Sequence, residues 1–144
     1  MRLEDLPSSA RIPDGFELAQ SRGKFTNHNG PVFVASAPED LRSGLYVLQR
    51  HCNSMGFLHG GMASAFADRA LAVAVWSALR APSVTLKLTL HFYETVPAGS
   101  WLEAWPILHA NEDGIVHVSA DMRIDGEVLA ARADAAFRKI RRPR

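Results

Sequence analysis

The sequence has little cysteine and no large excess of charge of either sign. The single cysteine, Cys52, cannot form an internal disulfide, and no apolar leader follows Met1, so the chain is expected in the reducing cytoplasm. The 16 Lys and Arg residues nearly balance the 15 Asp and Glu residues, which removes the general electrostatic reason to expect a nucleic-acid partner. The sequence also lacks a cluster with metal-ligand spacing, so no metal site is expected.

The length of 144 residues, with 47% hydrophobic residues, predicts a single domain over residues 1–144. Residues 1–30 are rich in turn-forming residues and predict an irregular lead-in with at most a short helix. Residues 139–144 complete a short basic tail, which is most often a solvated end, although such a run can also contact a phosphate-bearing ligand.

A long apolar helix is the strongest predicted element. Residues 62–79 are mostly good helix formers, two glycines precede them, and a proline follows shortly after. Because apolar residues occur on every side, the helix is expected to be buried all round. Its length approaches that of a membrane span, but the charges of Asp68 and Arg69 at its middle predict a protein-covered core and no membrane partner.

Asp68 is the anomaly in this helix, because burying a carboxylate among apolar side chains is costly unless a partner compensates. No cation lies three or four residues away on the same helix face. Two interpretations stay open at this point. In the first, Asp68 is structural: it contacts an arginine or a backbone amide of a neighbouring strand, or it lies at the hydrated edge of an interface. In the second, Asp68 is a catalytic carboxylate.

Strands are expected on both sides of the helix, at residues 32–35 and 44–50 before it and at 83–92 after it. The last of these alternates without a break, which places Val84 and the following even-numbered apolar residues on the helix side and Thr85 on the opposite side. Pro106 predicts an edge or a bulge in the next strand, at 101–110.

The final hairpin is expected to turn through two residues, Asp125 and Gly126, which would set Met122 opposite Leu129. In this register every pair on one face is apolar, and the other face carries polar pairs. The order of elements predicts an α+β fold in which an antiparallel sheet curves around one helix.

The loop before the helix, together with Asp68, carries the motif Asn53-x5-His59-Gly60-Gly61-x6-Asp68. In this spacing, and in its order of elements from about residue 45 to about 140, the chain resembles the hotdog-fold acyl-CoA thioesterases, in the branch that includes the phenylacetate-degradation enzymes. The resemblance implies a hotdog fold, a curved antiparallel sheet wrapped around one long central helix. It also implies hydrolysis of an acyl-CoA thioester, the substrate, to a carboxylic acid and coenzyme A, with no metal or redox cofactor.

The resemblance also implies roles for single residues. Asp68 would act as general base or nucleophile, and the backbone N–H of Gly60 would polarise the thioester carbonyl. Asn53 would position water or substrate, and His59 would brace the loop; the alternatives are that Asn53 is a turn residue and His59 a loop histidine with its hydrogen bonds satisfied. The expected substrate contacts are Gly61, Thr85, Phe57 and Met55, with Thr85 assisting the carboxylate in spite of its predicted side of the strand.

In the family, the carboxylate of one subunit faces the loop of another, which implies a homodimer or a homotetramer built as a dimer of dimers. Two other functions stay open: a hotdog-fold hydratase or dehydratase, and a non-catalytic dimer that binds acyl-CoA. The sequence leaves the acyl group open, as well as the choice between a coenzyme A and a carrier-protein thioester. A Cys52 nucleophile is disfavoured because no cationic partner is identified to stabilise its thiolate beyond the nearby His51 and His59.

Overall fold

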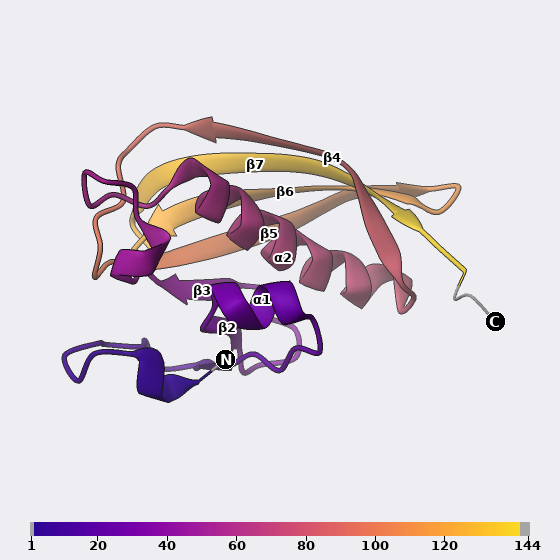
Figure 1. Ribbon diagram of the computed structural model, residues 1–144. Coiled ribbons are helices and arrows are strands. Elements are labelled where there is room, and N and C mark those ends of the chain that lie inside the picture. The colour runs from indigo at the N-terminus through magenta and orange to yellow at the C-terminus, as the bar shows by residue number, and fades with distance from the viewer. Residues whose placement is uncertain (1, 142–144) are drawn as a thin grey trace.

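The computed structural model describes residues 2–141 (Figure 1). Its elements in chain order are the 3-10 turn η1 (Leu3–Asp5), strand β1 (Phe16–Leu18), helix α1 (Lys24–Asn29), strands β2 (Val32–Ala35) and β3 (Ser43–Tyr46), the 3-10 turn η2 (Gln49–His51), helix α2 (Gly60–Leu79), and strands β4 (Ser83–Phe92), β5 (Trp101–Glu112), β6 (Ile115–Ile124) and β7 (Val128–Lys139).

The strands form one antiparallel sheet in the order β1-β2-β3-β5-β6-β7-β4, and α2 lies along one face of it (Figure 1). The predicted α+β architecture, with one long helix against a curved antiparallel sheet, is confirmed. The expectation of an irregular lead-in with at most a short helix is wrong in part, because residues 1–30 also contain β1, which pairs with β2; the six-residue helix α1 is the short helix that was allowed for. Strands β1 and β4 form the two edges of the sheet.

An aromatic cluster explains why the lead-in becomes part of the sheet. The buried ring of Trp101 has Phe16 of β1 and Phe33 of β2 against it, with ring centroids 5.2 and 5.5 Å away in edge-on geometry. Trp101 also covers Gly44, where an added Cβ would lie only 2.1 Å from the indole ring. The indole N–H donates to the buried carboxylate of Glu103 at 3.0 Å, so the ring is fixed from both ends.

Helix α2 buries one face rather than its whole surface. Its fully buried residues recur at intervals of three and four and are mostly small, so the helix packs closely on the sheet: Ala63, Phe66, Ala67, Ala70, Leu71, Ala74 and Val75. Trp76, by contrast, is 45% exposed. The expectation of burial on all sides is therefore wrong for the single chain. By length and composition alone α2 would also qualify as a membrane span, a test that core helices of soluble proteins pass as well.

Strand β4 contains a β-bulge that the alternating sequence did not predict. Thr85 lies opposite Phe137 of β7 and Lys87 lies opposite Ala136, so Leu86 is the extra residue on β4. Because Phe137 is buried, Thr85 faces the helix, and Leu88 beyond the bulge does so as well. The predicted single apolar face is therefore wrong at its beginning, where Val84 and Leu86 are 44% and 48% exposed.

The last hairpin is confirmed as a hairpin, but its predicted register is wrong by two residues. The turn has three residues, since Ile124 pairs with Val128, and a second irregularity follows after Met122. Met122 consequently lies opposite Ala131 instead of Leu129. A shift of two keeps each side chain on its face, so the apolar face stays apolar.

Pro106 lies where the sequence predicted, on an unpaired flank. Strand β3 pairs with β5 only as far as Ala104, and beyond that point β5 pairs with β6 alone among the described residues. The missing N–H of the proline therefore costs the sheet no hydrogen bond on that side.

Candidate active site

The loop before α2 is shaped by the side chain of Asn53. Its Oδ1 accepts hydrogen bonds from the backbone N–H groups of Met55 at 3.0 Å and Phe57 at 3.2 Å. The backbone N–H of Asn53 in turn donates to the carbonyl of Phe57, and Gly56 takes a positive φ of 82° to close the turn. Asn53 therefore does act as a turn residue, and its side-chain nitrogen is left for other contacts.

His59 caps the helix. The ring Nδ1 of His59 accepts a hydrogen bond from the backbone N–H of Gly61 at 2.9 Å. The backbone N–H of His59 donates to the carbonyl of His51 at 2.9 Å. Because Nδ1 accepts, the neutral ring carries its proton on Nε2. Gly61 leaves room for this contact, since a Cβ there would lie 3.1 Å from Nδ1.

The cap distinguishes the two glycines. The N–H of Gly61 is occupied by His59, whereas the N–H of Gly60 has no hydrogen-bond partner within residues 2–141. Gly60 is exposed, and an added Cβ would have only the ring of Phe92 nearby, at 3.8 Å. A free N–H at the positive end of the helix dipole favours an anionic oxygen.

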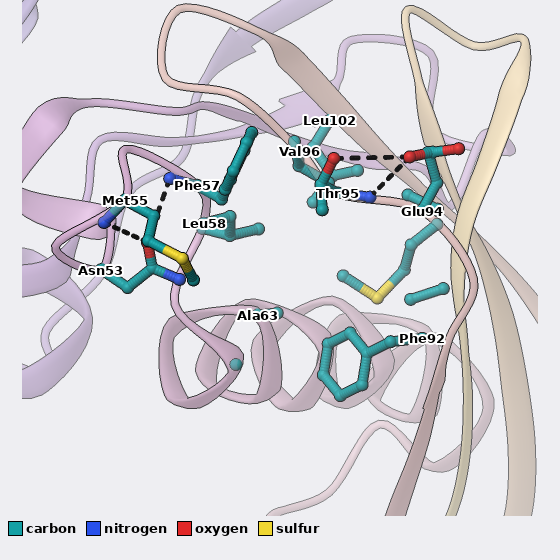
Figure 2. Close-up of a pocket in the computed structure, with 14 residues that line it drawn as sticks. Asn53, Met55, Phe57, Leu58, Ala63, Phe92, Glu94, Thr95, Val96 and Leu102 are labelled. Carbon is teal, nitrogen blue, oxygen red and sulfur yellow. Dashed lines mark hydrogen bonds between the residues drawn. The ribbon is translucent and has the colours of Figure 1, made fainter.

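A cavity of about 280 Å³ opens beside this helix terminus (Figure 2). Figure 2 shows Met55 and Phe57 on the loop and Phe92 beside the first turn of α2. On the connection after β4, the backbone N–H and the hydroxyl of Thr95 donate to the carboxylate of Glu94. Most of the lining is apolar, and its polar side chains are those of Asn53, Glu94 and Thr95. The lining residues are Asn53, Met55, Phe57, Leu58, Gly60, Ala63, Phe92, Glu94, Thr95, Val96, Leu102, Met122, Ala130 and Ala131. The structure therefore gathers Asn53, Met55, Phe57 and Gly60 around one apolar space.

Asp68 lies elsewhere on the same helix. It follows Gly60 by eight residues, a rise of about 12 Å along the helix axis. Its Oδ1 accepts a hydrogen bond of 2.6 Å from the hydroxyl of Thr85. Asp68 is half-buried, beside α1, and does not line the cavity next to Gly60. Within one chain the predicted residues thus form two sets, Asp68 with Thr85 and the loop with Gly60.

Burial shifts the pKa of three further titratable groups near these two sets of residues. Burial raises the pKa of the Cys52 thiol, whose Sγ approaches the carbonyl of Leu48 at 3.4 Å, so the thiolate form is disfavoured. Burial lowers the pKa of Arg69 and is also the main cause that lowers the pKa of His51. Cys52 is therefore a poor nucleophile here.

The residues that the sequence did not point to are the strand residues of the cavity, above all Leu102, Met122 and Ala131. They are ordinary apolar strand positions in the sequence, and only the pairing of β5, β6 and β7 brings them to one place. In the described part of the chain, no three His, Cys, Asp or Glu side chains lie close enough together to hold a metal ion.

Residues 55–131, which include the end of the loop, all of α2 and the strands that line the cavity, match the model of the Thioesterase superfamily. The match covers more than half of the chain, and the chain belongs to this superfamily. Over 129 residues it is 30% identical to the Pseudomonas aeruginosa protein PA0474, which is named as a putative esterase. That alignment covers 88% of this chain and 96% of the relative.

Solved structures show the same hotdog fold. The phenylacetic acid degradation protein PaaI of Escherichia coli superposes with a TM-score of 0.74 at 18% identity, covering 83% of this chain and 86% of that one. A mutant form of PaaI from Thermus thermophilus gives 0.71 at 22% identity, over 82% and 100%. An acyl-CoA hydrolase of Staphylococcus aureus, in complex with butyryl coenzyme A, gives 0.64 at 20% identity, over 70% and 63%.

Proposed function

We propose that this protein is an acyl-CoA thioesterase, which hydrolyses an acyl-CoA thioester to a carboxylic acid and coenzyme A. The observation that carries the proposal is the free N–H of Gly60 at the helix N-terminus, beside an apolar cavity. Membership of the thioesterase superfamily supports the reaction class. The Staphylococcus aureus neighbour, named an acyl-CoA hydrolase and solved with coenzyme A and butyryl coenzyme A, supports the choice of thioester.

The helix terminus would bind the reacting carbonyl. In the proposed complex the thioester oxygen accepts the N–H of Gly60 while the acyl group occupies the apolar cavity. Attack on the carbonyl carbon places negative charge on that oxygen, and a fixed N–H at a helix N-terminus stabilises this charge more than it stabilises the neutral carbonyl. The role of His59 is to hold the terminus in place, because it occupies the neighbouring N–H of Gly61.

Asp68 would supply the basic group, either by taking a proton from the attacking water or by attacking the carbonyl carbon itself. The hydroxyl of Thr85 donates to one carboxylate oxygen, which fixes the orientation of the group and leaves the other oxygen for the reaction. The carbon–sulfur bond then breaks, and coenzyme A leaves as the thiolate and is protonated to the thiol. If Asp68 acts as base, it returns the proton that it took from water; if Asp68 acts as nucleophile, the acyl group stays on it as a mixed anhydride, which water then hydrolyses to the carboxylic acid. This chemistry needs neither a metal nor a redox cofactor.

The two sets of residues would meet across two copies of the chain. Strand β4 is an edge strand ten residues long, and its Val84 and Leu86 are exposed apolar side chains, as is Trp76 of α2. An open edge of this length is a template for pairing with another strand. Pairing of β4 with β4 of a second copy would extend the sheet across a twofold axis and satisfy the backbone groups of this edge.

The bulge in β4 supports a particular register for this pairing. If the twofold axis passes through Thr89, then residues 87–91 pair in a regular way, and Leu86 is the extra residue beyond them. Thr85 then lies opposite Phe92 of the partner subunit, with both side chains on the helix side of the sheet. Since Phe92 is the side chain next to the helix terminus, the carboxylate held by Thr85 would reach the terminus of the partner subunit.

Release of free thiol from a panel of acyl-CoA and acyl-carrier-protein thioesters tests the reaction. Steady release supports a thioesterase, and the preferred carrier identifies the leaving group. Hydration of an enoyl-CoA without thiol release would show a hydratase instead, and binding without turnover would show an acyl-CoA-binding protein. Asp68→Asn should reduce kcat at least about 100-fold while the chain stays folded, because the amide cannot act as base or nucleophile. Near-normal kcat in this variant would remove Asp68 from the mechanism.

Mixing two variants tests the shared site: Asp68→Asn, which lacks the basic group, and Asn53→Ala, which is expected to lose activity because it removes the side chain that shapes the loop before Gly60. In a mixed dimer of Asp68→Asn and Asn53→Ala, one site is intact and the other carries both lesions. Random exchange makes half of the dimers mixed, so activity should recover to about one quarter of the wild-type value by site counting. Each variant incubated alone is the control. Proven subunit exchange without recovered turnover would place both residues in a site within one chain.

A further inference from the structure

The cavity beside Gly60 has a mouth and a closed inner end, as the burial of its lining shows. Met55 and Phe92, on the loop and at the end of β4, are 73% and 55% exposed. Leu102 and Met122, on the central strands, are 1% and 0% exposed. Gly60 is exposed and thus lies at the mouth. A thioester bound at its N–H would direct the acyl group inward, toward the strands.

The inner end owes its space to the register of the last hairpin. Met122 on β6 lies directly opposite Ala131 on β7, and both line the cavity. A long, flexible side chain thus faces a methyl group, so the space in front of the small residue is not filled by its neighbour. Ala131 is buried, and its other strand neighbour is Phe92 at the mouth. Met122, Ala131 and Phe92 therefore form one row across β6, β7 and β4 along the wall of the cavity.

We propose that this cavity is the acyl pocket, that it takes an uncharged apolar acyl group of about nine heavy atoms, and that Met122 and Ala131 set the upper limit of its length. The proposal rests on the proposed thioester site at Gly60. The size follows from the volume of about 280 Å³, since a water-sized group occupies about 30 Å³. The lack of cations among the lining residues, together with the carboxylate of Glu94 on one side, disfavours acyl groups that carry a second carboxylate.

A homologous series of ligands measures the length of the pocket. Straight-chain S-alkyl coenzyme A thioethers of six to fourteen carbons cannot be hydrolysed, so their binding reports on the pocket without turnover. The acyl-CoA thioesters of the same lengths give kcat/KM in parallel. Each methylene that enters an apolar pocket improves binding about fourfold, and the gain stops where the pocket ends. For the wild type, the gain is expected to stop near eight or nine carbons.

Two substitutions should move this limit in opposite directions. Ala131→Val adds two carbons inside an existing space, so it should shorten the limit by about two carbons and change the octyl-to-hexyl binding ratio about tenfold. Met122→Ala removes three heavy atoms and should lengthen the limit by two to three carbons. Ala136→Val makes the same change as Ala131→Val on the same strand, away from the cavity, and should leave the limit unchanged. Thermal unfolding checks that each variant is folded.

The outcomes separate this proposal from the thioesterase assignment. Opposite shifts in the two variants, in binding or in kcat/KM, support the pocket. The same length limit in wild type, Ala131→Val and Ala136→Val would show that the acyl group binds elsewhere, even if Met122→Ala fails to fold. Thiol release would in that case still support a thioesterase. Conversely, a limit that shifts in binding without any thiol release would support the pocket and refute the thioesterase.

Discussion

Thr85→Val removes the hydroxyl that holds the carboxylate of Asp68 and changes little else. Valine has nearly the shape of threonine, and the lost contact is the 2.6 Å hydrogen bond from Oγ1 to Oδ1 of Asp68. A hydrogen bond to a charged group is worth about 1.5–3 kcal/mol. If this bond orients the carboxylate in the transition state, its loss should lower kcat about 10- to 100-fold, since about 1.4 kcal/mol corresponds to a factor of ten.

The assay is thiol release with kcat and KM determined separately. Thr85 does not line the cavity, so KM should stay within about twofold of the wild type, and the loss should appear in kcat. Thr85→Ser is the matched control, because it restores the hydroxyl and should recover most of the activity. Thr85 is exposed and Asp68 only half-buried, so the melting temperature should change little.

Two results would refute this reasoning. Wild-type kcat in Thr85→Val would show that the carboxylate needs no help from the hydroxyl. An equal loss in Thr85→Ser and Thr85→Val would show that the strand at the bulge responds to any substitution, so that the hydrogen bond is not the cause.

Three further predictions concern assembly and stability. Thr89→Cys, made without the native cysteine, should form a disulfide between two copies under oxidation, visible on a non-reducing gel, because facing residues at the proposed twofold axis have Cα atoms about 5 Å apart. Gly44→Ala should lower the free energy of unfolding by at least about 1–3 kcal/mol in denaturant titrations, since its Cβ would collide with Trp101. Burial lowers the pKa of His51, so the unfolded chain takes up that proton first as the pH falls. The melting temperature should accordingly drop below about pH 6.5, and His51→Gln should reduce that drop.

The sequence was sufficient for elements whose signals are local. The helix formers between two glycines and a proline predicted α2 to within two residues, and the alternating residues predicted β4 over its full length. The motif residues Asn53, His59 and Gly60 lie in the loop and at the first residue of α2, because a short stretch of chain keeps them together. These signals need no knowledge of the pairing between distant segments.

The errors come from features that leave the residue pattern unchanged. A bulge at Leu86 is invisible in a strand whose even positions are all apolar, and the parity argument therefore placed Thr85 on the wrong side. Similarly, a hairpin shifted by two residues still pairs apolar with apolar. The predicted partner of Met122 was Leu129, a large residue, where the structure has Ala131. The space at the inner end of the cavity could therefore not be predicted from the expected register.

The edge strand β4 also bears on how a single chain behaves before the proposed dimer forms. A newly folded single chain presents ten residues of open strand with apolar side chains at their start, and such an edge adds indiscriminately to other exposed strands. Lys87, immediately after the bulge, is the one Lys, Arg, Asp or Glu residue in β4 and is exposed. Burying a charge costs free energy, so Lys87 disfavours packing of this edge against apolar surfaces. It does not prevent the backbone groups of β4 from pairing with a strand in a matched register. If the chain dimerises as proposed, the same short segment would both limit pairing with unrelated strands and direct the pairing of the two copies.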